Sequence, residues 1–553
     1  MKRLAILLIS VLVHVSMLIP QAQGAEFRYS VAPLNIPLPA ATPSNTWRGY
    51  SPISVSDIND NRQTVGSASY YDASRDDHSA AFFWEPGMAE ATVRYPGDPD
   101  LYGFQINGIN ASGQMVVNEE IERGVYNVIR TEANFASPQI LTTNHYNSGI
   151  AINNSGVVVG VGDWPNRKAT IWESPTATPR TVPQLPGSLA TLLPSRCFSI
   201  NDLGQVIGIA YVQFFYPPTG QYYDKSTSFF YTMANGAMHE LVAVDRDRYA
   251  IAHEVNNNGL VVGQSHKSGA YIYAEPLYWD AGGVPHAIRD KVPATFYDGY
   301  MMNIDDANNM YLSTSVKGSS AWVYNPAWTE AKSINDLIPA DSGYQVGGVT
   351  TVSQGGLVIC SANDAADNNV NLLLTPYDVL TSDVAAGSGA STTLGGGASQ
   401  TGGVAATFSE VTGAGEMIAH YGNESTGDFA LQFLTDPAAM DPVAGMVPGD
   451  NAQHWLVDFE GGTFTGPVTL TFCYDDTLLP PGFDENQLVL LHYTDGAWET
   501  LTPSAINTTL NTITFDTDSF SPFVLGTPVP EPCSAMILAI SACGLLKRKR
   551  SGH

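Results

Sequence analysis

The sequence predicts an all-β protein, a seven-bladed β-propeller followed by a β-sandwich, and three observations predict it. A short phrase recurs seven times between residues 27 and 378 at intervals of about 49 residues, as in repeat architectures. Each copy has the pattern of a β-hairpin. The composition agrees, since 44% of the 553 residues are apolar, only 14% are charged, and 51 Gly and 35 Pro supply turns.

The repeated phrase begins with an apolar residue and Asn, passes through two turn residues and Gly, and continues into a β-branched run. Asn and Asp favour such turns and Gly adopts positive φ, so each copy predicts two strands joined by a tight turn. Copies six and seven carry Asp305 and Ser353 in place of Asn. The copies begin at Ile58, Ile109, Ile152, Ile200, Val255, Ile304 and Val352.

Two further strands follow each hairpin, as in Ala81–Trp84 and Ala91–Arg94 of the first copy, which makes four strands per blade. The seventh copy lacks its last strand, and a similar run, Phe27–Leu34, stands near the N-terminus. We therefore expect this first strand to close the ring by pairing with the last blade around Asn371–Leu374. An open β-solenoid, the alternative, would not need a strand from the other end of the repeat region.

The Ile-Asn-x-x-Gly-x-Val-Val-Gly and Ala-Phe-x-Trp phrases resemble the HAF repeat of extracellular bacterial proteins over about 350 residues. The resemblance implies an extracellular location and carries no established chemistry. Aromatic residues recur at similar places in several copies, so we expect them to pack between blades rather than to stack on sugars. They are Trp84, Trp172, Trp279 and Trp322.

The N-terminus has the features of a secretory signal peptide over residues 1–24. A short positive segment precedes an apolar run, Leu4–Leu18, and small residues precede the cleavage site between Gly24 and Ala25. A membrane anchor is the alternative, but the apolar run is short for a span. We expect signal peptidase to act here during export.

The C-terminal tail, residues 527–553, combines Val529-Pro530-Glu531-Pro532, an apolar stretch from Cys533 to Leu546, and the basic cluster Lys547-Arg548-Lys549-Arg550. This order resembles the PEP-CTERM sorting signal of exported bacterial proteins. The resemblance implies removal by an exosortase in a Gram-negative-type bacterium, after transient membrane contact. A plain tail anchor is the alternative. The chain is then secreted or held at the cell surface.

Between the propeller, residues 25–380, and the second domain, residues 404–526, the Gly/Ser/Thr-rich residues 381–403 predict a flexible linker. The second domain shows short strand-like runs separated by turns, which favours a β-sandwich. Asn486–Tyr493 and Ser519–Phe523 resemble ZU5-type modules, some of which cleave themselves at His-Phe-Ser. Ser519 stands where that His would be, so self-cleavage is not expected.

Residues 404–525 contain 17 Asp and Glu and no Lys or Arg. Such carboxylates are either solvated or bound to cations. Ca²⁺ prefers oxygen ligands, and two turn-located pairs of acids are candidates, although none has EF-hand spacing. These calcium candidates are Asp475, Asp476, Asp484 and Glu485.

The sequence predicts no catalytic residue and no cofactor other than possible calcium. Nucleotide, hydrolase and zinc-protease motifs are absent from it, and its histidines are scattered. The net charge of −28 argues against a nucleic-acid partner. We therefore expect a non-enzymatic surface or extracellular-matrix protein that binds a polysaccharide or protein through propeller loops. The alternative is a propeller-based glycan hydrolase or lyase, which needs convergent carboxylates around the central channel.

Overall fold

The computed structural model divides the chain into two compact units, Tyr29–Pro376 and Met1–Arg28 with Tyr377–His553. The signal-cleavage pair Gly24 and Ala25 and the sorting tail lie outside the described residues. The structure describes residues 26–40, 45–47, 53–72, 77–95, 104–162, 167–183, 185, 195–216, 221–244, 248–267, 274–293, 299–314, 320–339, 342–422, 446–447, 453–479, 481–494, 497–520 and 522–528.

The described residues form strands and short 3-10 helices, with no α-helix among them, so the all-β prediction is confirmed. No helix in this part of the chain is long and apolar enough to cross a membrane. The 3-10 helices are η1 (Ala133–Phe135), η2 (Ile334–Asp336), η3 (Gly397–Ser399), η5 (Asp476–Leu478) and η6 (Glu485–Gln487).

In the unit Tyr29–Pro376, consecutive stretches of chain form antiparallel sheets, most of them of four strands. The first contains β2 (Asn45–Trp47), β3 (Ile53–Ile58), β4 (Thr64–Asp72), β5 (Asp77–Trp84) and β6 (Thr92–Arg94). The next two contain β7 (Phe104–Ile109), β8 (Met115–Glu122), β9 (Val125–Glu132) and β10 (Ala136–His145), then β11 (Ser148–Ile152), β12 (Val158–Gly162), β13 (Lys168–Trp172) and β14 (Arg180–Thr181).

The series continues in the same order. The following sheets contain β15 (Ser195–Ile200), β16 (Gln205–Tyr216), β17 (Gln221–Thr232) and β18 (Ala237–Leu241), then β19 (Arg248–Val255), β20 (Val261–Lys267), β21 (Ala274–Trp279) and β22 (Pro285–Ala287). After them come β23 (Gly299–Ile304), β24 (Met310–Thr314), β25 (Ala321–Tyr324) and β26 (Lys332–Ser333), then β27 (Gln345–Val352), β28 (Val358–Asn363) and the first part of β29 (Asn369–Val384).

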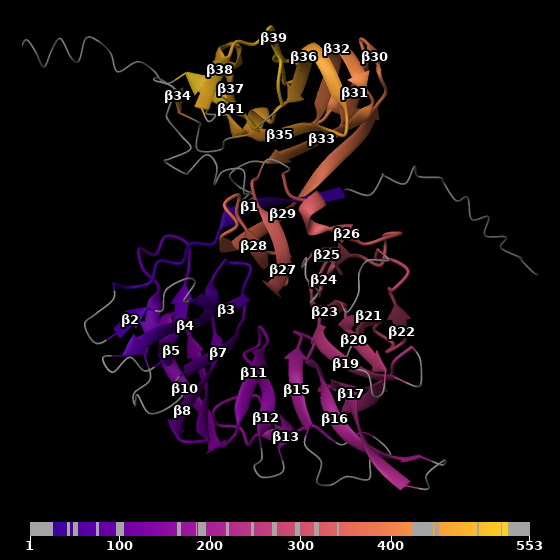
Figure 1. The fold of residues 1–553 in the computed structure, drawn as a ribbon. Coiled ribbons are helices and arrows are strands. Elements are labelled where there is room, and N and C mark those ends of the chain that lie inside the picture. The colour runs from indigo at the N-terminus through magenta and orange to yellow at the C-terminus, as the bar shows by residue number, and fades with distance from the viewer. Residues whose placement is uncertain are drawn as a thin grey trace, which may run out of the picture. The chain divides into compact units, whose positions relative to one another are not determined.

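The innermost strands of these sheets form a closed series. Each contacts the innermost strand of the next sheet, in the order β3, β7, β11, β15, β19, β23 and β27, and β27 contacts β3 again. Figure 1 shows these strands around one centre. Antiparallel sheets repeated radially about a centre are the architecture of a β-propeller. The open solenoid is therefore excluded, because its last repeat would not contact its first.

The N-terminal strand β1 (Glu26–Pro33) pairs with β29 in the last sheet of this ring, as the sequence predicts. The backbone N–H of Leu34 donates to the carbonyl of Asn371, and the hydroxyl of Ser30 to the carbonyl of Thr375. The backbone N–H of Tyr29 donates to the carbonyl of Leu337 in the preceding sheet's connection. Residues more than 300 positions apart thus complete one sheet.

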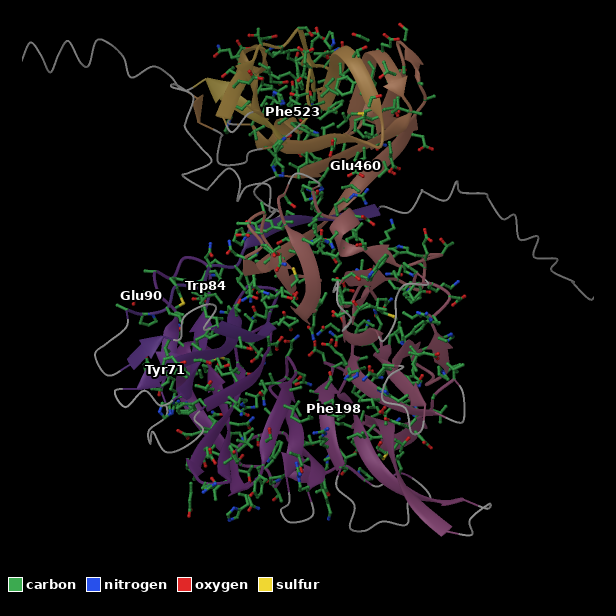
Figure 2. The ribbon with its side chains drawn as sticks, in the orientation of Figure 1. Tyr71, Trp84, Glu90, Phe198, Glu460 and Phe523 are labelled. Carbon is green, nitrogen blue, oxygen red and sulfur yellow. The ribbon has the colours of Figure 1, made fainter. Side chains whose placement is uncertain are left out.

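Large apolar side chains pack between neighbouring sheets. Trp172 of β13 lies in a cluster with Val116 and Val128 of β8 and β9, and Trp279 of β21 packs with Ile207 of β16. Trp84 and Trp322 are partly buried against similar clusters. The expected packing role of these tryptophans is confirmed, and Figure 2 shows side chains filling the spaces between the sheets.

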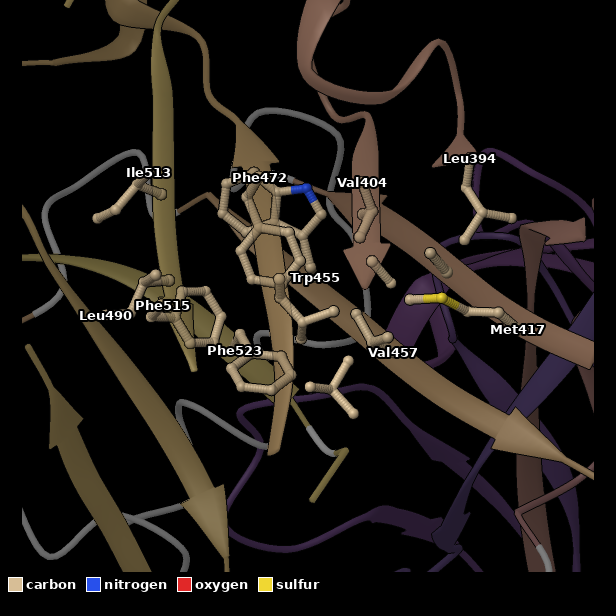
Figure 3. Close-up of a cluster of buried hydrophobic side chains, with 14 of the residues drawn as sticks. Leu394, Val404, Met417, Trp455, Val457, Phe472, Leu490, Ile513, Phe515 and Phe523 are labelled. Carbon is tan, nitrogen blue, oxygen red and sulfur yellow. The ribbon is translucent and has the colours of Figure 1, made fainter. Parts of the chain in front are cut away.

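The second unit contains two antiparallel sheets that share one core. One has the end of β29, β33 (Gly415–Gly422), β35 (His454–Glu460), β41 (Pro522–Pro528), β37 (Val489–Thr494) and β38 (Ala497–Leu501), with β34 (Met446–Val447) on β41. The other has β30 (Gly387–Ser388), β31 (Ser391–Leu394), β32 (Val404–Gly413), β36 (Thr463–Cys473), β40 (Thr512–Thr517) and β39 (Ala505–Asn507). Trp455 stacks on Phe472 at 4.6 Å in this core (Figure 3).

The segment 381–403, predicted as a flexible linker, is instead part of the second unit. β30 and β31 pair with β32, and the side chains of Val384 and Leu394 are buried in the shared core. Glycines at positive φ, including Gly389 and Gly396, turn the chain between these short strands. Composition suggested flexibility, but sparse apolar residues at the right spacing are enough to anchor such a segment.

Candidate binding cavity at the centre of the ring

Each innermost strand of the ring carries a β-bulge just before the repeated phrase. The pairing register shifts between Val55 and Asp57 in β3 and between Ala252 and Glu254 in β19. The same shift recurs at the same place in β7, β11, β15, β23 and β27. A bulge bends its strand and redirects side chains. The repeat therefore presents two consecutive residues per sheet toward the centre.

The Asn of the repeated phrase is buried and bonds in two directions. In Asn201 the side-chain oxygen accepts the backbone N–H of Gln205, which fixes the turn. Its Nδ2 donates to the carbonyl of Asn256 in the next sheet at 2.7 Å. Asn59, Asn110, Asn153 and Asn256 donate in the same way to the next copy.

The residue after each Asn forms an outer ring of hydrogen bonds at the cavity mouth. The backbone N–H of Asn154 donates to Asp202, that of Asp202 to Asn257, and that of Asn257 to Asp306. The amide of Asn154 also donates to Gln354, which joins the third copy to the seventh. These bonds hold the turns in fixed positions around the centre.

Copies six and seven lack the Asn, and other bonds replace it. The carboxylate of Asp305 accepts from the backbone and side chain of Asn309 and from the hydroxyl of Tyr311. The hydroxyl of Tyr29 in β1 donates to that of Tyr311 at 3.1 Å. Burial raises the pKa of Asp305 to about 6. The weaker copies are thus tied to the closing strand.

The bulges and turns enclose a cavity of about 270 Å³. It is lined by residues of β3, β7, β11, β15, β19, β23 and β27 and of the turns that follow them. Among the described residues its lining contains no Lys or Arg, but it does contain Asp57, Asp60, Glu254 and Asp306. All these residues belong to the unit Tyr29–Pro376.

Asp57 lies at the bulge of β3 and links three sheets. Its Oδ2 accepts the backbone N–H of Ile109 in the next sheet at 2.9 Å, and its Oδ1 accepts from Ile58 and from the hydroxyl of Thr351. Gly108, at the equivalent position of β7, has no side chain to obstruct this approach. Burial raises the pKa of Asp57 to about 6, and the three hydrogen bonds oppose that rise.

Glu254 occupies the equivalent position in β19. Its Oε2 accepts the backbone N–H of Ile304 in the next sheet at 3.0 Å. Burial raises its pKa to about 8, and the negative charges of Asp57 and Asp305 add to the rise. Glu254 therefore holds its proton at neutral pH unless a cation lies beside it.

The remaining wall is less polar. Gly108, Ala151 and Ser199 stand at the equivalent positions of β7, β11 and β15. The bulge residue Phe198 also lines the cavity and lies on the inner side of its sheet (Figure 2). His253, the bulge residue of β19, has its pKa lowered to about 4 by burial and by the neighbouring His266. The two bulge carboxyl groups thus lie on β3 and β19, well apart in the order of the ring, and the small and aromatic groups occupy β7, β11 and β15 between them.

The calcium candidates lie in the second unit, where Asp475 and Asp484 cap the short 3-10 helices that begin with Asp476 and Glu485. Asp475 accepts from the backbone and hydroxyl of Thr477, and Asp484 from the backbone and amide of Asn486. These bonds to Asn486 lower the pKa of Asp484. Glu485 accepts a hydrogen bond from the hydroxyl of Tyr474. In the described ranges, no three His, Cys, Asp or Glu side chains are grouped closely enough to hold a metal ion. Calcium binding remains a prediction.

Neither Asp57 nor Glu254 stands out as a site residue in the repeated phrase, which begins one position after each of them. The position before the first residue of each repeated phrase holds Asp57, Gly108, Ala151, Ser199, Glu254, Asn303 and Thr351. Reading that column across the copies would have found both acids. The alternation of a regular strand does not show which way these side chains point, because the bulge shifts them to the other face of the sheet.

Comparisons with known proteins give a fold likeness and no family. No protein-family model matches the chain, and no curated protein matches it. Among solved structures, the β-propeller domain of the Trilobed protease from Pyrococcus furiosus shares 11% identity at a TM-score of 0.41, covering 60% of this chain and 96% of that one. The acylaminoacyl peptidase of Pyrococcus horikoshii shares 9% at 0.38, over 64% and 57%.

A third solved structure, YCF48 bound to D1 peptide, shares 8% identity at a TM-score of 0.35 and covers 61% of this chain and 99% of that one. Likenesses at this level assign no activity, substrate or partner to the present chain.

Proposed function

We propose that this chain is a secreted, non-enzymatic surface or matrix protein whose propeller binds a glycan or protein ligand at its centre. The proposed fold is a seven-bladed β-propeller followed by a β-sandwich. The observation that carries the ligand-binding proposal is the central cavity, because it is concave, polar and lined by strands that hydrogen bonds hold rigidly. A preformed site loses little entropy when it binds a ligand.

Export and sorting are proposed from the two chain ends, with signal peptidase and exosortase as the processing enzymes. The mature protein should begin at Ala25 and lack Lys547–Arg550. Intact mass spectrometry of the exported protein tests this. A mature form that retains the basic cluster would rule out the proposal that the C-terminal tail is a cleaved sorting signal.

A glycan array with the processed protein tests ligand binding. Ser199→Trp, which fills the cavity from β15, is the matched variant, and an exposed substitution such as Glu90→Gln is the control. We expect Ser199→Trp not to bind the glycans that the native protein binds. Equal binding by both would place the ligand elsewhere, on the outer loops.

A glycan hydrolase or lyase is the second candidate, and one observation favours it. Asp57 and Glu254 present two carboxyl groups to one cavity, with pKa values of about 6 and about 8, so at neutral pH Glu254 holds a proton and Asp57 is largely ionised, as an acid and base pair requires. Against it, both groups accept backbone hydrogen bonds from the next sheet, which explains their presence without chemistry. Release of reducing ends from polysaccharides, lost in Glu254→Gln, would establish the enzyme.

A further inference from the structure

The cavity is lined by several carboxyl groups with no positively charged side chain of the described lining beside them. Two carboxyl groups, those of Asp57 and Glu254, face it from the bulges, and Asp60 and Asp306 lie at its mouth. No lysine or arginine of the part of the chain that the structure describes lines it. Buried carboxylates are stabilised by cations, and an anionic cavity without one attracts a cationic ligand.

The hydrogen bonds leave acceptor capacity on the carboxyl groups of the cavity. A carboxylate offers about four lone-pair positions. Glu254 uses some of them for the backbone of Ile304 and the side chain of Asn303. An ammonium group has three donors on one compact centre, which suits the remaining positions.

The wall formed by β7, β11 and β15, between the two acidic strands, suits a small ring. Gly108, Ala151 and Ser199 leave space, and Phe198 offers an aromatic ring. The guanidinium of Arg196, which does not line the cavity, lies 4.9 Å from the centroid of that ring, so a cation is already held at Phe198. A volume of about 270 Å³ lies below the usual range of ~300–1,000 Å³ for ligand pockets. It fits one small unit rather than a long chain.

We propose that the central cavity binds an amino sugar with a free ammonium group, which pairs with Glu254 and Asp57 while the sugar ring lies toward Ser199 and Phe198. This inference rests on the proposed ligand-binding function of the cavity and names its ligand class. The hydroxyl groups of the sugar meet the amide of Asn154 at the mouth and that of Asn107 at the bulge of β7.

Calorimetric titration of the mature protein at pH 6.5 tests the proposal with D-glucosamine, N-acetyl-D-glucosamine and D-glucose. Acetylation removes the positive charge and keeps the ring. We expect glucosamine to bind at least tenfold more tightly than the other two. Glu254→Gln and Asp57→Asn should each weaken glucosamine binding by about tenfold, and the exposed control Glu90→Gln should leave it unchanged. Thermal melts of each variant confirm that it is folded.

Proton release gives a second readout that a structural role of Glu254 would not produce. Glu254, with a pKa of about 8, faces Asp57, Asp305, Asn303 and the backbone of Ile304, and holds its proton at pH 6.5. An ammonium beside it favours the carboxylate, so binding should release up to one proton. Titration in buffers of different ionisation enthalpy measures this number, which should fall in Glu254→Gln.

Four outcomes would overturn the proposal. Equal affinity for all three sugars would show that the cavity does not select a charged ligand. Loss of that binding in Ser199→Trp would show that the cavity is nevertheless the ligand site. Tighter binding of lysine amide than of glucosamine would show that the cavity recognises an ammonium group and not a sugar. Binding of Ca²⁺ that depends on Glu254, with no binding of glucosamine, would make the cavity a metal site. Absence of every ligand from the cavity, together with glycan binding elsewhere, would overturn the proposed site as well.

Discussion

Each buried Asn of the repeat stabilises the fold in two ways, because one side chain both caps its own turn and reaches the next sheet. Asn201 accepts from Gln205 and donates to the carbonyl of Asn256. Loss of a buried partner leaves polar groups unsatisfied, and this costs about 1–3 kcal/mol for each group. The amide is therefore needed for the ring as well as for the hairpin.

Asn201→Ala should lower the free energy of unfolding of the protein by about 2–3 kcal/mol. Asn201→Asp should cost more, because its carboxylate would face the carbonyl of Asn256 without a donor. Urea denaturation measures both. Asn235→Ala is the control, since Asn235 accepts one exposed bond in an outer turn. If Asn201→Ala lowers the free energy of unfolding no more than the control does, the hydrogen bonds of Asn201 do not stabilise the ring.

Glu254 should make the protein less stable as the pH rises. The folded state holds the proton of Glu254 up to a pKa of about 8, whereas an unperturbed Glu loses it near 4.5. The unfolded state therefore binds fewer protons between these values, and stability falls across that window. Glu254→Gln should remove this slope and gain on the order of 2 kcal/mol at pH 8.

Urea denaturation at pH 5, 6.5 and 8 measures the effect for Glu254→Gln, for the native protein and for Glu90→Gln. Asp57 and Asp305, with pKa values of about 6, contribute a slope of the same sign below that pH. A native protein whose stability rises from pH 6.5 to 8 would contradict the assignment.

At the scale of elements, the strand β1 completes the last sheet of the ring. It pairs with β29, and its Tyr29 reaches Tyr311 in the preceding sheet through their hydroxyl groups. An unpaired β29 edge would expose backbone groups and apolar side chains. Ring closure therefore depends on residues that lie more than 300 positions from the strand that they complete.

Deletion of Phe27–Leu34 should lower the melting temperature of the protein strongly, with a loss of several kcal/mol, because a whole paired strand is removed. Thermal denaturation measures this. A synthetic peptide of residues 26–35 added in trans should restore part of the loss, while the same residues in scrambled order should not. A melting temperature unchanged by the deletion would show that the ring does not need β1.

At the scale of the whole molecule, charge is distributed unevenly. Residues 404–525 hold 17 acids and no Lys or Arg, yet the same chain buries a large apolar core there. Self-repulsion among such carboxylates destabilises the compact state and is screened by salt, over a Debye length of about 10 Å at 0.1 M.

Melting of the mature protein in sodium, magnesium and calcium chloride at matched ionic strength separates screening from binding. Screening predicts equal stabilisation in all three. A calcium site at Asp475, Asp476, Asp484 and Glu485 predicts an additional rise in millimolar Ca²⁺, which grows with concentration as a native-state ligand requires. Asp484→Asn with Glu485→Gln should abolish that additional rise. Equal curves would remove the calcium site, and the absence of any response to salt would remove the repulsion.

The sequence by itself determined the features that depend on local patterns. Turn residues and alternation placed the hairpins, the aromatic strands and the closing strand Phe27–Leu34, because each pattern extends over a few neighbouring residues. It did not determine that residues 381–403 join the core of the second unit. Their Gly and Ser content concealed two buried residues, Val384 and Leu394.

The contacts at the centre of the ring follow from the packing of the sheets and not from any local sequence pattern. The hydrogen bond from Asn201 to Asn256 joins residues 55 positions apart, and the one from Asn154 to Gln354 joins residues 200 positions apart. Asp57 and Glu254 meet the same cavity because a bulge in each innermost strand turns them inward and the ring then closes. No local pattern encodes these contacts, since they arise when sheets formed separately along the chain pack around one axis.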